Sequence, residues 1–176
     1  MAITLKQDEA VPTYPATPTG LSVAAAAINA AVIWTRIEAY VSARWTARAV
    51  VWTVEGPGEW VPILTPATIT LTEKWTGTAW AADTPPASPL GGYALADATF
   101  RLTGTVGGGT VPEAVKEAFR RLAEYLAEDP KTRGTNRESY SVGPINIDFR
   151  RDPAWLGAAM INSGAADLLR PYRRAA

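Results

Sequence analysis

The sequence predicts an α+β protein in which a helical core carries an inserted, small antiparallel β module. Two observations lead to this prediction. Apolar residues recur at helical spacing from Val111 to Asp129, and again in a stretch near the N-terminus. Between these stretches, over about residues 46–106, the apolar period changes to two, as in half-buried strands. The helical core should therefore comprise an opening helix, a central amphipathic helix and a short C-terminal helix.

The central helix has the clearest pattern in the chain. Pro112 suits its first position, where no backbone N–H is needed, and Pro130 ends it. Glu117 and Arg121 lie four residues apart and can form an ion pair on the exposed face. The opposite face is an apolar stripe made of Val115, Ala118, Phe119, Leu122, Tyr125 and Leu126. This stripe must be buried against other parts of the chain.

Residues 1–20 are expected to form an extended arm with little regular structure, because Pro12, Pro15 and Pro18 interrupt them. A domain over residues 21–176 follows. Ser22 can cap an opening helix that runs to about Trp45. Its apolar stripe contains Val23, Ala27, Ala30, Trp34, Ile37 and Val41. The apolar surface is wider than one partner helix needs, so it implies either a second internal partner or a neighbouring subunit.

The β module over about residues 46–106 is predicted from alternating segments separated by glycine and proline. The clearest strands are centred on Trp52, Ile69 and Leu102. Gly107-Gly108-Gly109 then leads to the central helix. This triplet is interpreted as a linker, since the Lys-Ser/Thr pair of a phosphate-binding loop is absent.

The C-terminal part begins with a long irregular segment over residues 130–151, which includes a short strand at Ile145, Ile147 and Phe149. A loop of this length is usually functional or ordered by a partner. A short helix is predicted from Ala154 to Ile161, followed by a final turn over Ala165–Leu169. Residues 165–176 are expected to be a tail that docks on a partner.

Composition narrows the range of chemistry. The chain has 17 basic and 17 acidic residues, and it contains neither histidine nor cysteine. The usual general base and the commonest metal ligands are therefore missing, so we expect no catalytic residues, no metal site, no cofactor and no enzyme activity. No apolar run reaches the roughly 18 residues of a membrane span, so no membrane partner is expected.

Three stretches together resemble the head–tail connector (adaptor) family of long-tailed phages and gene transfer agents. The first is Ile37-Glu38-Ala39-Tyr40 at the end of a helix, with Arg44 and Trp52 after it. The second is a strand ending in glycines, then Val111-Pro112 and a helix with Ala118, Leu122 and Tyr125. The third is Leu168-Leu169-Arg170-Pro171-Tyr172-Arg173, similar to an ending common in that family.

The resemblance implies a structural virion protein, assembled in the host cytoplasm and located in the neck between head and tail. Such a protein forms a dodecameric ring of its own copies below the portal protein. It carries the next neck component, a stopper or tail-terminator protein. DNA passes through the ring without sequence-specific binding, and the zero net charge of this chain is consistent with such a channel.

Two sets of residues are candidates for contacts in such a ring. The portal-docking tail comprises Leu168, Leu169, Arg170, Pro171, Tyr172 and Arg173. Leu169 and Tyr172 would act as apolar anchors there, and Arg173 would pair with an anionic group. The subunit interface is expected to draw on Trp34, Ile37, Trp60, Trp75 and Trp80. Of these, Trp34 lies in a regular element that also favours the core, and the last three remain open between interface and core.

Two alternatives stay open. The first is another neck protein, a stopper or a tail terminator, although the helix–sheet–helix order favours the adaptor. The tryptophans and threonine-rich strands also suggest a carbohydrate-binding module. Exposed, coplanar tryptophans on one sheet face would favour that second alternative.

Overall fold

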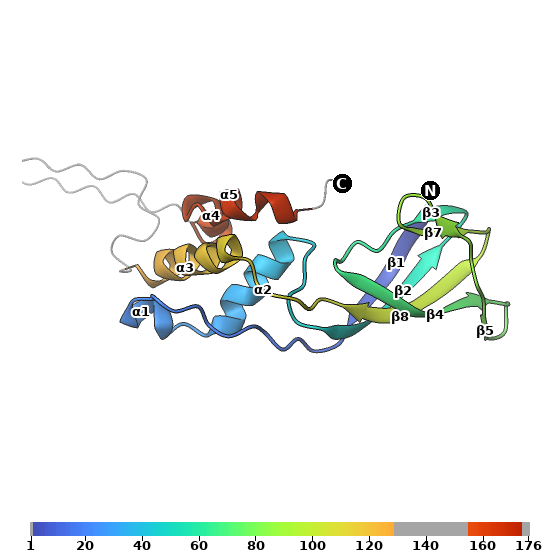
Figure 1. The fold of residues 1–176 in the computed structure, drawn as a ribbon, viewed down its shortest axis with the longest axis horizontal. Helices are drawn as coiled ribbons and strands as arrows, with labels where there is room; N and C mark the ends of the chain where they lie inside the picture. The colour runs from blue at the N-terminus through green and yellow to red at the C-terminus, as the bar shows by residue number, and fades with distance from the viewer. Residues whose placement is uncertain (1, 129–154, 174–176) are drawn as a thin grey trace, which may run out of the picture. The chain divides into compact units, whose positions relative to one another are not determined.

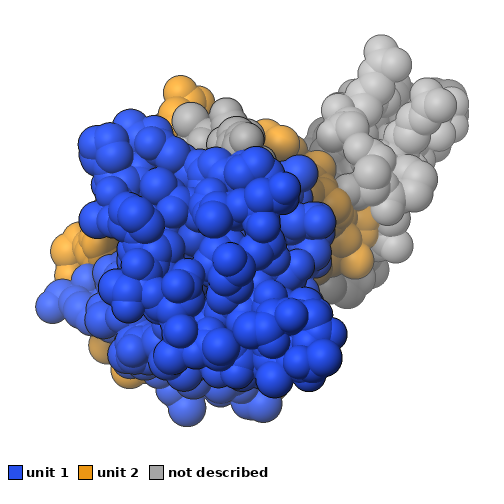
Figure 2. Space-filling model, turned by 90° about the vertical axis from the view of Figure 1, so that its right-hand side faces the viewer, with its two compact units in different colours: residues 1–15, 42–110, 176 blue, residues 16–41, 111–175 orange. Residues whose placement is uncertain are grey.

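The computed structural model describes residues 2–128 and 155–173 (Figure 1). The chain divides into two compact units, which are coloured separately in Figure 2. The β unit is formed by residues 2–15 and 42–110. The helical unit is formed by residues 16–41, 111–128 and 155–173. Helices and antiparallel sheets are both present, so the mixed α and β content predicted from the sequence is confirmed.

Two antiparallel sheets build the β unit (Figure 1). In spatial order, the five-stranded sheet consists of β1 (Ile3–Glu9), β2 (Arg48–Glu55), β8 (Thr99–Val106), β4 (Ala67–Trp75) and β5 (Trp80–Ala82). The three-stranded sheet consists of β3 (Gly58–Trp60), β7 (Gly92–Leu95) and β6 (Ala87–Ser88). The predicted change of period near residue 46 therefore marks the start of real strands.

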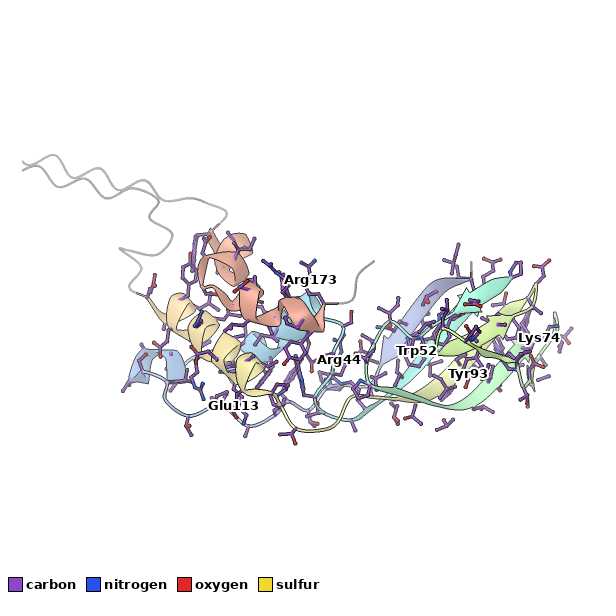
Figure 3. The ribbon with its side chains drawn as sticks, turned by 45° about the horizontal axis from the view of Figure 1, so that its top comes forward. Arg44, Trp52, Lys74, Tyr93, Glu113 and Arg173 are labelled. Atoms are coloured by element: carbon purple, nitrogen blue, oxygen red, sulfur yellow. The ribbon has the colours of Figure 1, made fainter. Side chains whose placement is uncertain are left out.

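The core of the β unit follows from the alternation in β2 and β8. Val50, Trp52 and Val54 point to the interior, while the residues between them are more exposed. Figure 3 labels Trp52 in this interior, and Tyr93 packs partly buried against the same cluster. The buried members come from both sheets and from segments next to them: Ala2, Val50, Trp52, Val54, Trp60, Leu64, Leu95, Phe100, Leu102 and Val106.

The N-terminal segment differs from the prediction. Residues 1–20 were expected to have little regular structure, but β1 forms an edge strand paired antiparallel with β2. The prolines that suggested an arm begin only at Pro12, after the strand has ended. Two indole N–H groups hold the strand: Trp60 Nε1 donates to Thr4 Oγ1 at 2.8 Å, and Trp52 Nε1 donates to Gln7 Oε1 at 2.9 Å. The five-stranded sheet thus includes residues from outside the stretch 46–106.

The end of the β unit contains the glycine triplet. Gly107, Gly108 and Gly109 all have positive φ angles, between 87° and 109°. A Cβ on Gly107 would lie 2.3 Å from the carbonyl oxygen of Thr46, so only glycine fits at that position. The triplet is therefore a conformational linker into the next helix, as its sequence indicated.

The helical unit contains, among the described residues, five α-helices and a final 3₁₀ turn (Figure 1). These are α1 (Val23–Ala26), α2 (Ala30–Tyr40), α3 (Glu113–Ala127), α4 (Trp155–Asn162), α5 (Ala165–Leu169) and η1 (Arg170–Tyr172). The central helix α3 contacts α1, α2, α4 and α5, so it organises this unit.

The predicted stripe of α3 is confirmed for its main members. Val115, Ala118, Phe119 and Leu122 are buried, and Phe119 packs against Trp34 of α2 with ring centroids 4.9 Å apart. The charged face also follows the sequence. Glu117 accepts hydrogen bonds from Arg121 at 3.0 Å and from Arg120 at 3.1 Å, and these bonds lower the pKa of its carboxyl.

The opening helix is shorter than predicted and is divided into two helices. The prediction of one helix from Ser22 to about Trp45 is wrong, because α1 ends at Ala26 and α2 runs from Ala30 to Tyr40. Asn29 causes the restart: its side-chain oxygen accepts the backbone N–H of Ala31 at 2.9 Å, as a helix cap does. Val23, predicted to lie on the buried stripe, is 92% exposed.

A pair of short hydrogen bonds attaches α1 to α3. Ser22 donates its backbone N–H to Glu124 Oε1 and its hydroxyl to Glu124 Oε2, each at 2.7 Å. These bonds favour the ionised carboxylate and lower the pKa of Glu124 below its ordinary value. Their contribution is therefore present above the ordinary carboxyl pKa and is lost as the pH falls through the lowered value.

We expect Glu124→Gln to loosen α1 at neutral pH, because a neutral amide offers one acceptor instead of two charged oxygens. In the wild type, the same loosening is expected only in acid, below the usual glutamate pKa of about 4.3. Amide chemical shifts of Ser22 and Ala25, followed by NMR from neutral to acidic pH, measure both effects. Glu113→Gln removes another paired carboxylate of α3 and should leave these shifts unchanged.

The C-terminal elements agree with the prediction where they are described. The short helix and the final turn appear as α4 and α5, separated by Gly164 in the left-handed conformation. The predicted irregular segment over 130–151, its short strand at Ile145, Ile147 and Phe149, and the last residues of the tail, 174–176, lie outside the described residues.

Candidate interaction surfaces

The described residues show no candidate metal centre. Within residues 2–128 and 155–173, no group of three or more acidic, histidine or cysteine side chains could hold a metal ion. Among the helices that the structure describes, none combines the length and the apolarity needed to cross a lipid bilayer. The candidate sites of the described residues are surfaces that could contact other macromolecules.

The predicted docking tail is folded against its own unit. Leu169 is fully buried, and α5, which carries it, packs on α3. Leu168 and Tyr172 are partly buried, while Arg170, Pro171 and Arg173 are exposed. Arg173, labelled in Figure 3, places its guanidinium carbon 4.7 Å from the ring centroid of Tyr40.

The role predicted for Leu169 is therefore corrected. A side chain that fills the core of the helical unit is not available as an anchor in the groove of a partner. The pattern was misleading because an amphipathic final turn has the same sequence whether its apolar side meets its own chain or another chain. Only the exposed side of the tail, formed by Arg170, Pro171 and Arg173, remains open to contacts.

The tryptophans predicted at an interface divide into two groups. Trp34, Ile37 and Trp60 are almost completely buried inside their own units, so the prediction that they lie at a subunit interface is wrong. Each fills the interior of its own unit, where a large apolar side chain removes much surface from water. Trp75 and Trp80, in contrast, reach the surface, with Trp75 exposed to 39%.

Trp75 and Trp80 form a surface patch with two charged residues. The indoles face each other across the β4–β5 hairpin, with ring centroids 5.2 Å apart. The Arg101 guanidinium carbon lies 4.7 Å from the ring centroid of Trp80, and Arg101 donates to Glu73 at 2.7 Å. This hydrogen bond lowers the pKa of the Glu73 carboxyl. We call these four residues the hairpin patch.

The geometry of the hairpin patch bears on the carbohydrate-binding alternative. Sugar rings stack well on flat aromatic platforms, but the two indole planes are inclined by 57° and are not coplanar. Arg101 also lies over the ring of Trp80. The patch therefore lacks the coplanar arrangement that would favour sugar binding.

A second surface lies between α2 and α4. It is a groove of about 400 Å³ lined by Arg36, Ala39, Tyr40, Leu156, Gly157 and Met160. Arg36 closes one side by donating from Nη1 to the carbonyl oxygen of Leu156 at 3.1 Å. Its lining is apolar except for Arg36 and Tyr40. We call it the α2–α4 groove.

The sequence analysis overlooked this groove, although α4 contains the signal for it. Every residue of α4 except Asn162 is apolar, so the helix has no polar face to present to solvent. Ala159 is buried and Trp155 packs against Tyr125, but the opposite side, with Leu156 and Ile161, is exposed. A helix that is apolar all round is normally covered on all sides.

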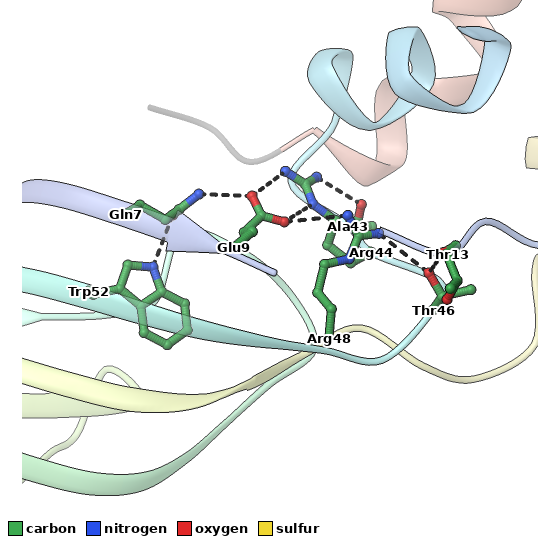
Figure 4. A network of polar contacts seen from close by, with 8 residues as sticks. All are labelled: Gln7, Glu9, Thr13, Ala43, Arg44, Thr46, Arg48 and Trp52. Atoms are coloured by element: carbon green, nitrogen blue, oxygen red, sulfur yellow. Dashed lines mark hydrogen bonds and ion pairs between the residues drawn. The ribbon is translucent and has the colours of Figure 1, made fainter. Parts of the chain in front are cut away.

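A charged network near the start of β2 is structural in character (Figure 4). Arg44 donates from Nε and Nη2 to the two carboxylate oxygens of Glu9, at 2.9 and 3.2 Å. Arg48 lies 3.6 Å from the same carboxylate. All three side chains are largely buried, and the bidentate pair ties the end of β1 to the segment that precedes β2.

Comparisons with protein-family models, with curated proteins and with solved structures gave no match in any of the three. The assignment of function therefore depends on the residues and surfaces described above.

Proposed function

We propose that this chain is a structural subunit of a ring, the head–tail connector (adaptor) of a tailed phage or gene transfer agent particle. In this proposal, its copies form a dodecameric ring between the portal protein and a stopper or tail-terminator protein. The ring lies in the neck of the virion after assembly in the host cytoplasm, and DNA passes through it.

The observation that carries this proposal is the exposed apolar side of α4, part of which lines the α2–α4 groove. Leu156 is exposed to 46% and Ile161 to 71%, although both belong to a helix without a polar face. A ring subunit presents two different patches to its two neighbours, so surplus apolar surface is expected in such a protein. An enzyme or a monomeric binding module has no such requirement.

The residues of the family resemblance give further support. Val111 and Pro112 directly precede α3, and the Leu-Leu-Arg-Pro-Tyr-Arg ending forms α5 and η1 on the same unit. The helical unit would thus be the ring-forming core, and the β unit would be its insert. The exposed arginines of the tail, Arg170 and Arg173, would meet acidic groups of the portal.

The test uses purified protein mixed with portal rings from the same kind of particle. Light scattering should give a complex heavier than the portal alone, and electron microscopy should show a second ring stacked on the portal. Arg170→Glu, at an exposed position of the tail, should weaken this binding. Lys74→Glu makes the same charge change on the β unit and should not weaken it.

Other outcomes favour the alternatives or exclude the proposal. Binding to tail tubes but not to portal would indicate a tail terminator, and binding only to a preformed portal–adaptor complex would indicate a stopper. Retention on a polysaccharide column that Trp75→Ala abolishes would indicate a carbohydrate-binding module. A chain that binds none of these particles and forms no ring would contradict the proposal.

A further inference from the structure

The five-stranded sheet has one long edge strand, β1 (Figure 1). The strands at the two ends of this sheet are β1 and β5, and β5 has only three residues. β1 has seven residues, of which five are exposed. Within the residues that the structure describes, β2 is the only strand that pairs with β1. The other side of β1, which we call its outer edge, is therefore a row of backbone groups that can receive a further strand.

The residues that face this outer edge follow from the pairing with β2. Ala10, just after β1, donates its N–H to the carbonyl oxygen of Ala49 at 2.9 Å. Successive residues of a strand direct their backbone N–H and C=O groups to opposite sides, so Asp8 also faces β2. Gln7 and Glu9 therefore direct theirs to the outer edge. The two indoles that hold β1 against β2 keep this edge in an ordered position.

The side-chain charges of β1 are arranged in a way that bears on such pairing. Lys6 and Asp8 are two residues apart, so they share one face of the strand, and Lys6 Nζ lies 2.6 Å from Asp8 Oδ2. Both side chains are mostly exposed. Lysine on an edge strand normally opposes the addition of another strand. That effect is cancelled when the added strand places a carboxylate opposite the lysine.

A second copy of β1, laid antiparallel along the outer edge, supplies this carboxylate in one register only. Pairing centred on Lys6 would bring two lysines together, and pairing centred on Asp8 would bring two aspartates together. Pairing centred on Gln7, whose backbone faces the outer edge, places Lys6 of each copy opposite Asp8 of the other. Opposite charges directly across two strands stabilise the pair, whereas like charges destabilise it. Charge complementarity therefore selects the register centred on Gln7.

Apolar side chains at the two ends of the strand fit the same register. Ile3 is 62% exposed at the start of β1, and Val11 is 92% exposed just after its end. Antiparallel pairing centred on Gln7 brings the start of one strand beside the end of the other. Ile3 then approaches Val11 of the second copy, and both lose contact with water.

We propose that β1 pairs antiparallel with β1 of a second copy of this chain, about a two-fold axis at Gln7. The two five-stranded sheets join into one continuous sheet, and the contact stops at two copies because it is self-complementary. It differs from the head-to-tail contacts of the proposed ring. The dimer is therefore a state of the chain in solution, and this inference does not rest on the proposed function. It covers an edge that would otherwise promote unspecific strand addition.

Reversal of the charges tests the contact on the full chain. Lys6→Glu and Asp8→Lys, each alone, place like charges opposite each other and should dimerise about tenfold more weakly than the wild type. Sedimentation velocity over a concentration series measures this. An equimolar mixture should form a heterodimer about as strongly as the wild type forms its dimer, since an acidic strand then meets a basic one. Neither variant retains the Lys6–Asp8 pair within its strand, so recovery in the mixture reports the contact between copies.

Hydrogen exchange locates the contact on the strand. The Gln7 amide, which faces the outer edge, should exchange rapidly in dilute protein and about tenfold more slowly where the dimer predominates. The Asp8 amide faces β2 and is the internal control, because it should exchange slowly at both concentrations. The thermal midpoints of both charge variants should stay close to that of the wild type, since the altered side chains are exposed.

The outcomes separate this inference from the proposed function. A wild type that stays monomeric, or a mixture of the charge variants that does not recover the dimer, overturns the pairing of β1. A dimer without protection of the Gln7 amide uses another surface and also overturns it, as does protection that requires a different protein. Portal binding decides the ring function in each of these cases. A dimer with the expected properties that fails to bind portal overturns the proposed function alone.

Discussion

Trp52→Ala is expected to lower the free energy of unfolding of the β unit by about 3–5 kcal/mol, as removal of a buried tryptophan usually does. Trp52 has no exposed surface and packs edge-on against Trp60, with ring centroids 5.5 Å apart. Its indole N–H also donates to Gln7, so the substitution leaves an acceptor of β1 without its partner. Both the sheet core and the attachment of the N-terminal strand should weaken.

Chemical denaturation and hydrogen exchange of β2 and β8 measure this loss. Trp75→Ala is the matched control, because it removes the same side chain from the surface of the same sheet and should change stability much less. Equal effects of the two substitutions would contradict the burial described for Trp52. Faster exchange throughout β1 in Trp52→Ala would show that the Gln7 contact holds the strand.

Leu169→Ala is expected to destabilise the helical unit by about 2–5 kcal/mol, the range for a buried leucine in a packed core. The side chain is fully buried, and α5 packs on α3 around it. Deletion of the chain from Leu168 onward should therefore disturb folding as well as any portal contact. Loss of portal binding in such a truncated chain is thus no evidence for a docking tail.

A substitution on the exposed side of the tail should affect stability much less than Leu169→Ala. Arg170→Ala removes a side chain whose only described ion pair, with Asp167, is largely exposed to solvent. The change in stability should stay within about 0.5 kcal/mol, as for most surface substitutions. Denaturation midpoints of Leu169→Ala and Arg170→Ala, followed by circular dichroism, test this difference in stability. A Leu169→Ala chain as stable as Arg170→Ala would mean that the tail is not part of the core.

The sequence predicted correctly those elements whose spacing of apolar residues fits only one kind of secondary structure and one buried face. The stripe of α3 has one period, one apolar face and a proline at its start, so both its position and its buried side were predictable. The alternation around Trp52 and Leu102 likewise could only belong to strands with one buried face. These patterns depend on neighbouring residues alone and need no knowledge of the partner.

The errors concern features that depend on distant partners. β1 becomes a strand because it pairs with β2 and receives hydrogen bonds from the indoles of Trp52 and Trp60. Residues 3–9 alone do not reveal these distant partners. Leu169 and Trp34 are apolar in the same way whether they face their own unit or another subunit. Asn29 was the exception, since a capping side chain inside an alanine-rich run is a local signal for a break. The apolar character of α4 was also visible in the sequence, but only the structure shows which side is left uncovered.

The path of the chain between the two units has a consequence for biosynthesis. β1 emerges from the ribosome before residues 16–41 of the other unit, and its partner β2 follows only after them. The β unit can close once β8 has left the ribosome, whereas α2 must wait for α3, whose Phe119 packs on Trp34. A nascent chain that has emerged from the ribosome only as far as Val106 would thus contain a complete sheet and an uncovered α2, a state in which chaperone capture competes with premature aggregation.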